Sequence, residues 1–184
     1  MFQNILVPLD GSALSESALP YAESLAGPLK ATLHLMMAVS LPSARGSGMF
    51  RLAASFLPSV QLPGSEADLD ATRHPVYKES EMASLEAEAK SYLLPTAERL
   101  QAKGLAVEVA VRFGRPAGEI FRYAQAANIE LIVMCTHGEG GPDAYAYGPT
   151  ADRVARRAPC PVMLIRPEEV MRVLPVPEAE EPRP

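Results

Sequence analysis

Residues 131–167, LIVMCTHGEGGPDAYAYGPTADRVARRAPCPVMLIRP, hold two apolar runs separated by a glycine-rich loop and a polar segment. We expect a buried strand over 129–136, a short helix over 148–158 and another strand over 161–165. Two strands joined through a helix are typical of a parallel sheet, because parallel neighbours need a crossover connection. This end of the chain therefore favours an α/β fold.

The rest of the chain continues the alternation. Apolar runs over 5–9, 32–39 and 105–112 predict three further strands, and helical spacing predicts helices over about 12–27, 81–103 and 116–127. We expect Pro20 to bend the first helix and Pro95 to kink the second. The order predicts an open, mostly parallel, five-stranded twisted sheet with helices on both faces and right-handed crossovers, a Rossmann-like architecture.

Proline marks two appendages to this pattern. The 184 residues include 18 prolines, about twice the usual frequency, and four of them fall in 41–80 and five in 167–184. Neither segment keeps a regular apolar period. We interpret the chain as one domain over 1–166 with an insertion at about 41–80, followed by an exposed tail over 167–184. Our hypothesis is that the insertion forms a lid or a dimer contact.

Bulk composition excludes several classes of protein. The net charge of −5 gives no basic footprint for nucleic acid, and no apolar run reaches the length of a membrane span. The start of the chain lacks the features of a signal peptide. Two cysteines, Cys135 and Cys160, are too few for a disulfide framework, and with three scattered histidines they give no metal-binding spacing. We expect a cytoplasmic protein without nucleic-acid or membrane partners.

Two loops are candidates for ligand binding, because ligands of parallel sheets bind beyond the carboxyl ends of the strands. The first loop, residues 8–12, follows the first strand, and Asp10 there could accept a hydrogen bond from a ribose hydroxyl. The second, residues 135–148, contains four glycines and ends at a helix N-terminus, which suits a phosphate. The alternatives are a flexible connector for the glycine-rich loop, and a turn or helix cap for Asp10.

The start ILVPLDGS and the closing stretch quoted above resemble the universal stress protein family. The resemblance covers the chain except the insertion and the tail, and implies an adenine nucleotide alpha hydrolase-like fold. The family's nucleotide motif is a glycine, two residues, a glycine, nine residues, then a glycine followed by serine or threonine. Gly138 and Gly148 match its second and third glycines, whereas Cys135 replaces the first and Pro149 replaces the serine or threonine.

The resemblance also implies a ligand and its site. The ligand is ATP or a related adenine nucleotide, with or without magnesium. The adenine end would be held by residues matching five positions, which are Pro8, Leu9, Asp10, Ala38 and Met134. The phosphate end would involve Cys135, His137, Gly138, Gly148, Pro149 and Thr150. For His137 a solvated loop position is the alternative, and both cysteines read as structural thiols or, alternatively, redox sensors.

Pro149 weakens the phosphate end. It removes one N–H donor and one hydroxyl, and a charge-assisted hydrogen bond contributes about 1.5–3 kcal/mol. Thr150 offers a partial substitute.

Three functions stay open at this point. The first is an ATP-binding stress-response or signalling module, a homodimer paired through its last strand at 161–166, as the resemblance implies. The second is a dimeric interaction protein with another protein as its partner, in which the degenerate phosphate loop marks a lost nucleotide site. The third is a slow ATPase, for which the sequence offers only loose candidate bases, Asp10, Glu139 and Asp143, and no group that would position a water.

Overall fold

The structure, a computed structural model, describes residues 2–40, 75–138 and 147–167. These form one five-stranded sheet in which every neighbouring pair is parallel. The spatial order is β3-β2-β1-β4-β5, with bounds β1 (Asn4–Leu9), β2 (Thr32–Val39), β3 (Ala106–Phe113), β4 (Leu131–Cys135) and β5 (Val162–Ile165). The predicted parallel α/β sheet is confirmed.

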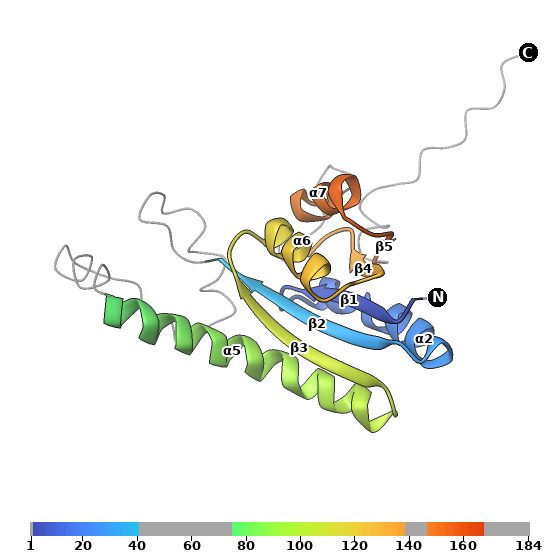
Figure 1. Cartoon of the computed structure of the whole chain (residues 1–184), viewed down its shortest axis with the longest axis horizontal. Helices are drawn as coiled ribbons and strands as arrows, with labels where there is room; N and C mark the ends of the chain where they lie inside the picture. Colours follow the sequence, from blue (N-terminus) through green and yellow to red (C-terminus); the bar gives the residue numbers. More distant parts are fainter. Residues whose placement is uncertain (1, 41–74, 139–146, 168–184) are drawn as a thin grey trace, which may run out of the picture.

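Helices cover both faces of the sheet. They are α1 (Ala13–Glu16), α2 (Leu19–Leu29), α5 (Pro75–Ala102), α6 (Pro116–Ala126) and α7 (Pro149–Arg157). Side chains of α2 and α5 share one buried cluster with alternate residues of β1, β2 and β4. Side chains of α6 and α7 share a second cluster with the residues between them. Figure 1 shows α5 and α6 on opposite sides of the sheet.

The central strand β1 explains this two-layer cover. Its residues Ile5, Leu6 and Val7 are all 0% exposed. Ile5 and Val7 belong to the cluster under α2 and α5, and Leu6 belongs to the cluster under α6 and α7. Because successive side chains of a strand point to opposite faces, an apolar run without alternation requires helices on both sides.

The order in which successive strands are added to the sheet reverses beside β1. The chain builds outward from β1 to β2 and β3, and then α6 carries it back to β4 on the other side of β1. After β1 the chain enters α1, whose Ser15 carbonyl contacts the Cys135 thiol in the α2/α5 cluster. After β4 it enters α7 on the opposite face. The connections that follow β1 and β4 therefore leave toward opposite faces of the sheet. Parallel sheets form a ligand crevice at such a point.

The helices differ from the sequence expectation at Pro20. The helix expected over 12–27 is two helices, α1 and α2, and Pro20 lies in the first turn of α2. A proline there costs no hydrogen bond, because the first N–H groups of a helix have no intrahelical partner. The expected bend at Pro20 inside one helix is therefore wrong. The end of α2 also lies beyond the expected Gly27-Pro28, at Lys30 in the left-handed conformation (φ 53°).

The long helix α5 also differs from its expected bounds. It begins at Pro75, so the last residues of the expected insertion belong to it, and the helix continues through Pro95 to Ala102. The rest of the expected insertion, 41–74, and the tail from 168 onward lie outside the described residues. Within the parts of the chain that are described, no helix combines the length and the apolar character needed to cross a membrane.

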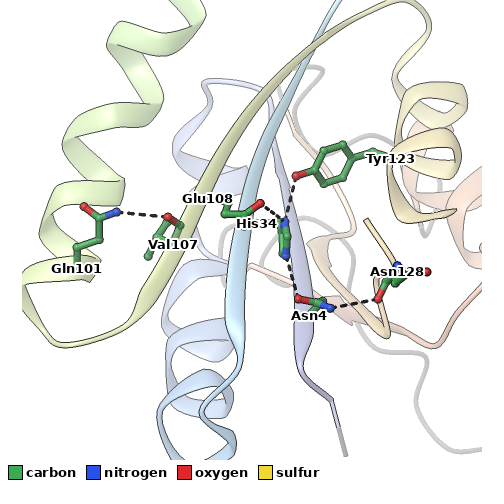
Figure 2. A network of polar contacts seen from close by, with 7 residues as sticks. All are labelled: Asn4, His34, Gln101, Val107, Glu108, Tyr123 and Asn128. Atoms are coloured by element: carbon green, nitrogen blue, oxygen red, sulfur yellow. Dashed lines mark hydrogen bonds and ion pairs between the residues drawn. The ribbon is translucent and has the colours of Figure 1, made fainter. Parts of the chain in front are cut away.

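A polar network centred on the buried His34 ties β1, β2, β3 and α6 together (Figure 2). His34 on β2 is 4% exposed, and its Nε2 lies 3.2 Å from Asn4 Oδ1. Asn4 donates its amide N–H to the Asn128 carbonyl (3.5 Å), so its oxygen faces the imidazole and accepts the Nε2 proton. His34 Nδ1 then accepts from the Tyr123 hydroxyl at 3.0 Å. The neutral ring satisfies both nitrogens in this way.

Protonation of His34 would change this pattern. Burial lowers the pKa of His34 from its usual value of 6.5, and the charge of Glu108, whose Oε2 lies 3.4 Å from Nδ1, raises it again in part. The net effect is a lowered pKa, because burial penalises the charged imidazole more than Glu108 stabilises it.

We expect the free energy of unfolding to fall as pH drops below 6.5, because the unfolded chain then binds a proton that folded His34 resists. Urea unfolding at pH 7.5 and at pH 5.5 measures this loss. His34→Gln should reduce the pH-dependent part of the loss, and Glu108→Gln should enlarge it by removing the charge that favours protonation. An unchanged pH dependence in His34→Gln would show that other groups cause it.

Candidate functional site

The loop after β1 holds Asp10 in a fixed orientation. The Ser12 backbone N–H and hydroxyl both donate to Asp10 Oδ1, at 3.1 and 2.6 Å. The same hydroxyl accepts from the Ser15 N–H (3.1 Å), which makes Ser12 the N-cap of α1. One serine therefore caps the helix and positions the exposed carboxylate at the carboxyl end of β1.

The loop after β4 is closed by backbone hydrogen bonds. The Thr136 N–H donates to the Ile165 carbonyl (2.8 Å), which anchors the start of the loop to β5. The Gly148 N–H donates to the Thr136 carbonyl, also at 2.8 Å, and joins the end of the loop to its start. Residues 139–146 between them, the middle of the predicted phosphate loop, lie outside the described residues.

The two loops touch at Gly138. A Cβ atom there would overlap Asp10 Oδ2 and would lie 2.9 Å from Asp10 Cγ. At Gly148, a Cβ would come within 3.3 Å of the Thr136 carbonyl oxygen, which is tight. Gly138 therefore lets the Asp10 carboxylate lie directly over the backbone of the second loop. Asp10, the predicted ribose acceptor, and Gly138, the second glycine of the motif, therefore lie side by side.

The Cys135 side chain does not take part in this contact. It is buried in the cluster under α2 and α5, and its thiol lies 3.7 Å from the Ser15 carbonyl oxygen. Burial raises the pKa of the Cys135 thiol to about 12, so almost no thiolate exists at neutral pH. This is the environment of a structural thiol rather than of a redox sensor. The cysteine at the first motif position is accommodated by the core.

The apolar residues expected at the adenine end divide between the two faces. Ala38 and Met134 pack in the cluster with α6 and α7, and Pro8 alternates with Leu6 on that same side of β1. Leu9 instead packs in the cluster under α2 and α5. A ligand over the α6/α7 side could therefore contact Leu9 only through its backbone.

His137 is buried rather than solvated. It is 4% exposed, and its Nδ1 lies 3.1 Å from the Thr136 hydroxyl oxygen. The alternative of a solvated loop histidine is therefore wrong. Its ring lies close to the backbone at Gly148, where a Cβ would be 4.0 Å from His137 Cδ2. His137 thus packs under the turn that leads into α7.

The N-terminus of α7 completes the described site. Gly148 is the N-cap, no side chain caps the helix, and Pro149 and Thr150 are its first residues. The first internal helix bond runs from the Asp152 N–H to the Gly148 carbonyl (2.9 Å). The N–H groups of Thr150 and Ala151 lie in the first turn, where a helix leaves its N–H groups without intrahelical acceptors.

The sheet is parallel and its strand order reverses beside β1, which places the chain among the doubly wound α/β proteins. The profile of the Universal stress protein family matches residues 1–166, and this chain belongs to that family. Universal stress protein YxiE of Bacillus subtilis (strain 168) is 30% identical over 166 residues, covering 90% of this chain and 100% of YxiE. The structure of UspA from Lactobacillus plantarum is similar at TM-score 0.64 and 26% identity, covering 90% and 98% of the two chains.

Two structures of similar fold contain adenine nucleotides. A universal stress protein in complex with cAMP has TM-score 0.54 and 18% identity over 90% of this chain and 97% of its own. A universal stress protein family member from Arabidopsis thaliana with AMP bound has TM-score 0.53 and 14% identity, over 89% and 91%. At these identities the likeness shows the fold alone.

Ser12 is the residue of this site whose role the sequence analysis missed. The expectation for the loop over 8–12 concerned Asp10 and did not include the serine that holds it. The signal was present, since an Asp followed two residues later by a serine is typical of a turn in which the carboxylate accepts from the following backbone. The unexpected part is the use of one hydroxyl for both partners.

We expect Gly138→Ala to destabilise the protein by about 1–3 kcal/mol, because the new methyl group must displace Asp10 and break its hydrogen bonds to Ser12. Denaturant unfolding measures the loss. In an Asp10→Ala background the same change should cost much less, which makes a double-mutant cycle. Gly118→Ala on α6 is the matched control, since its Cβ would meet only Arg122 atoms at 3.8 Å and beyond. Equal costs for Gly138→Ala in both backgrounds would refute the contact.

Proposed function

We propose that this universal stress protein binds an adenine nucleotide between the carboxyl ends of β1 and β4, and that it works as a stress-response or signalling module. The contact between Asp10 and Gly138 carries the proposal, because it brings an exposed carboxylate against a loop backbone that has no side chain. AMP and cAMP in two relatives of similar fold support an adenine nucleotide as the ligand. We extend this to ATP, with or without magnesium.

Each part of the nucleotide has a matching surface. Asp10 accepts a hydrogen bond from a ribose hydroxyl, since an ionised carboxylate only accepts. Pro8, Ala38 and Met134 offer apolar contacts to the adenine on the α6/α7 side of the sheet. The first-turn N–H groups of α7 face the phosphate end, where a helix N-terminus favours negative charge. The Cys135 side chain is in the core, so it does not occupy the space over the loop.

We expect AMP, cAMP or ATP to stabilise the protein in thermal unfolding, by about 2.7 kcal/mol at 100 times the dissociation constant. Asp10→Ala should abolish most of the shift, because it removes the ribose acceptor. Glu98→Ala, which removes an exposed carboxylate on α5, is the matched control and should leave the shift unchanged. The absence of a shift with every nucleotide at millimolar concentration would contradict the proposal, with magnesium or without it.

A second candidate is a dimeric interaction protein that has lost its nucleotide site and recognises another protein. Pro149 is the observation that favours it, because the first position of α7 has no N–H. The two candidates differ in the wild-type protein, where only the first predicts a nucleotide-dependent shift.

We also propose that the protein is a homodimer paired through residues 161–166. Within the described residues, β5 pairs with β4 alone and is an edge of the sheet, so its outer backbone groups suit a second strand. Met163 on this strand is 39% exposed. An apolar side chain on an edge strand suits burial against a second copy.

We expect Met163→Lys to raise the dimer dissociation constant about ten-fold or more, because a charged lysine on an edge strand opposes pairing. Size-exclusion chromatography with light scattering over a range of concentrations measures the change. Leu94→Lys is the matched control, because Leu94 is equally apolar and 46% exposed but lies on α5. A wild-type monomer at all concentrations, or equal effects of both substitutions, would refute dimerisation through β5.

A further inference from the structure

We infer that Tyr92 on α5 is a positioning residue for Asp10, and that it acts through Glu16 and the short helix α1. The inference rests on the proposed nucleotide site, in which Asp10 accepts from the ribose, and it concerns what holds that acceptor in place.

The helix α1 is too short to hold its own shape. It has four residues, Ala13–Glu16. A single turn of helix is unstable by itself in water, because it fixes several residues in return for few hydrogen bonds. The conformation of α1 therefore depends on contacts with the rest of the protein.

Asp10 is attached to α1 through both its side chain and its backbone. The N-cap Ser12 donates to the Asp10 carboxylate, as described above. The Ser15 hydroxyl accepts from the Asp10 backbone N–H (3.4 Å) and donates to the Ser12 carbonyl (2.8 Å). Ser15 is itself buried. Whatever fixes α1 therefore also fixes the orientation of Asp10.

Tyr92 connects the last residue of α1 to a much more rigid element. Its hydroxyl donates to Glu16 Oε1 at 2.7 Å. Tyr92 lies on α5, a helix of 28 residues, and packs against the cluster that α5 shares with α2 and the sheet. The next residue, Leu93, is fully buried. A hydrogen bond to an ionised carboxylate is stronger than one between neutral groups, so this contact is well suited to fasten α1 to α5.

The Tyr92 hydroxyl also lies close to Asp10. Burial raises the pKa of Tyr92 most, the hydrogen bond and charge of Glu16 raise it further, and the charge of Asp10 adds to this, while Ser15 lowers it in part. The hydroxyl therefore stays protonated at neutral pH and keeps its role as donor. Because both carboxylates act on it, the hydroxyl lies near both ends of the segment from Asp10 to Glu16.

Loss of the Tyr92 hydroxyl should affect one part of nucleotide binding only. Glu16 would lose its partner on α5, and the segment that orients Asp10 would become less ordered. Asp10 serves the ribose hydroxyls in the proposed site. The adenine and the phosphates would meet other residues, so their contribution to affinity should not change.

Calorimetric titration of the full-length protein tests this with AMP or ATP, whichever binds the wild type more tightly, and with the 2′,3′-dideoxy form of the same nucleotide. In the wild type, loss of the ribose hydroxyls should weaken binding about ten-fold, as expected for hydrogen bonds to a charged group. Tyr92→Phe should weaken binding of the normal nucleotide about three- to five-fold and of the dideoxy form less than two-fold. In an Asp10→Ala background, Tyr92→Phe should change neither affinity, because coupled residues are not additive.

Glu16 and Tyr21 supply the controls. Glu16→Gln keeps an oxygen that accepts from Tyr92 and should retain most of the wild-type affinity. Glu16→Ala should reproduce the effect of Tyr92→Phe, and the two changes together should be no worse than either alone. Tyr21→Phe is the matched control, because Tyr21 is 50% exposed on α2, and it should leave both affinities unchanged.

The outcomes separate this inference from the proposed function. Equal losses for both forms of the nucleotide in Tyr92→Phe would show a general structural role and overturn the inference, as would no loss for either. In both cases nucleotide binding by the wild type would stand. An additive loss in the Asp10→Ala background would also overturn it. If the wild type binds no nucleotide, the proposed function fails and the inference fails with it. Thermal unfolding of each variant without ligand confirms that it is folded under the conditions of the titration.

Discussion

The burial of β1 on both faces is the constraint on which the rest of the structure depends. Ile5, Leu6 and Val7 have no exposed surface, so this strand is stable only in the middle of a sheet with helices above and below. β2 and β4 supply its neighbours, and α2, α5, α6 and α7 supply its cover. This arrangement also positions the loop after β1 and the loop after β4, because the two strands lead into helices on opposite faces.

The site depends on one further close approach between these two loops. Asp10 is held by Ser12 from its own loop, and it lies over Gly138 of the other. A side chain at Gly138 would push the carboxylate away, whereas loss of the Ser12 hydroxyl would remove one of the hydrogen bonds to Asp10 and also uncap α1. The orientation of Asp10 is thus linked to the fold of α1. The contact with Asp10 therefore explains the glycine at position 138 without reference to a ligand.

The strands β1, β2 and β4 could be predicted from the sequence, because most of each apolar run is buried and the run is visible without knowledge of a distant partner. The break between α1 and α2 could not, because the apolar positions Leu14, Ala18 and Leu25 keep helical spacing across it. Asp10 and Gly138 were predictable from their places after two inner strands. The burial of His34 was not, because its partners Asn4 and Tyr123 are remote in sequence and meet it only in the fold.

The two departures from the family's nucleotide motif have unequal consequences, although each replaces one expected residue. Cys135 changes a side chain that the core absorbs, and it leaves the backbone N–H in place. Pro149 removes the N–H itself, at a position where the neighbouring N–H of Gly148 is already bonded to Thr136. A phosphate binds to backbone N–H donors, and the residue types in a motif specify these donors only indirectly. The first departure is therefore absorbed by the core, whereas the second changes the backbone at the first position of α7.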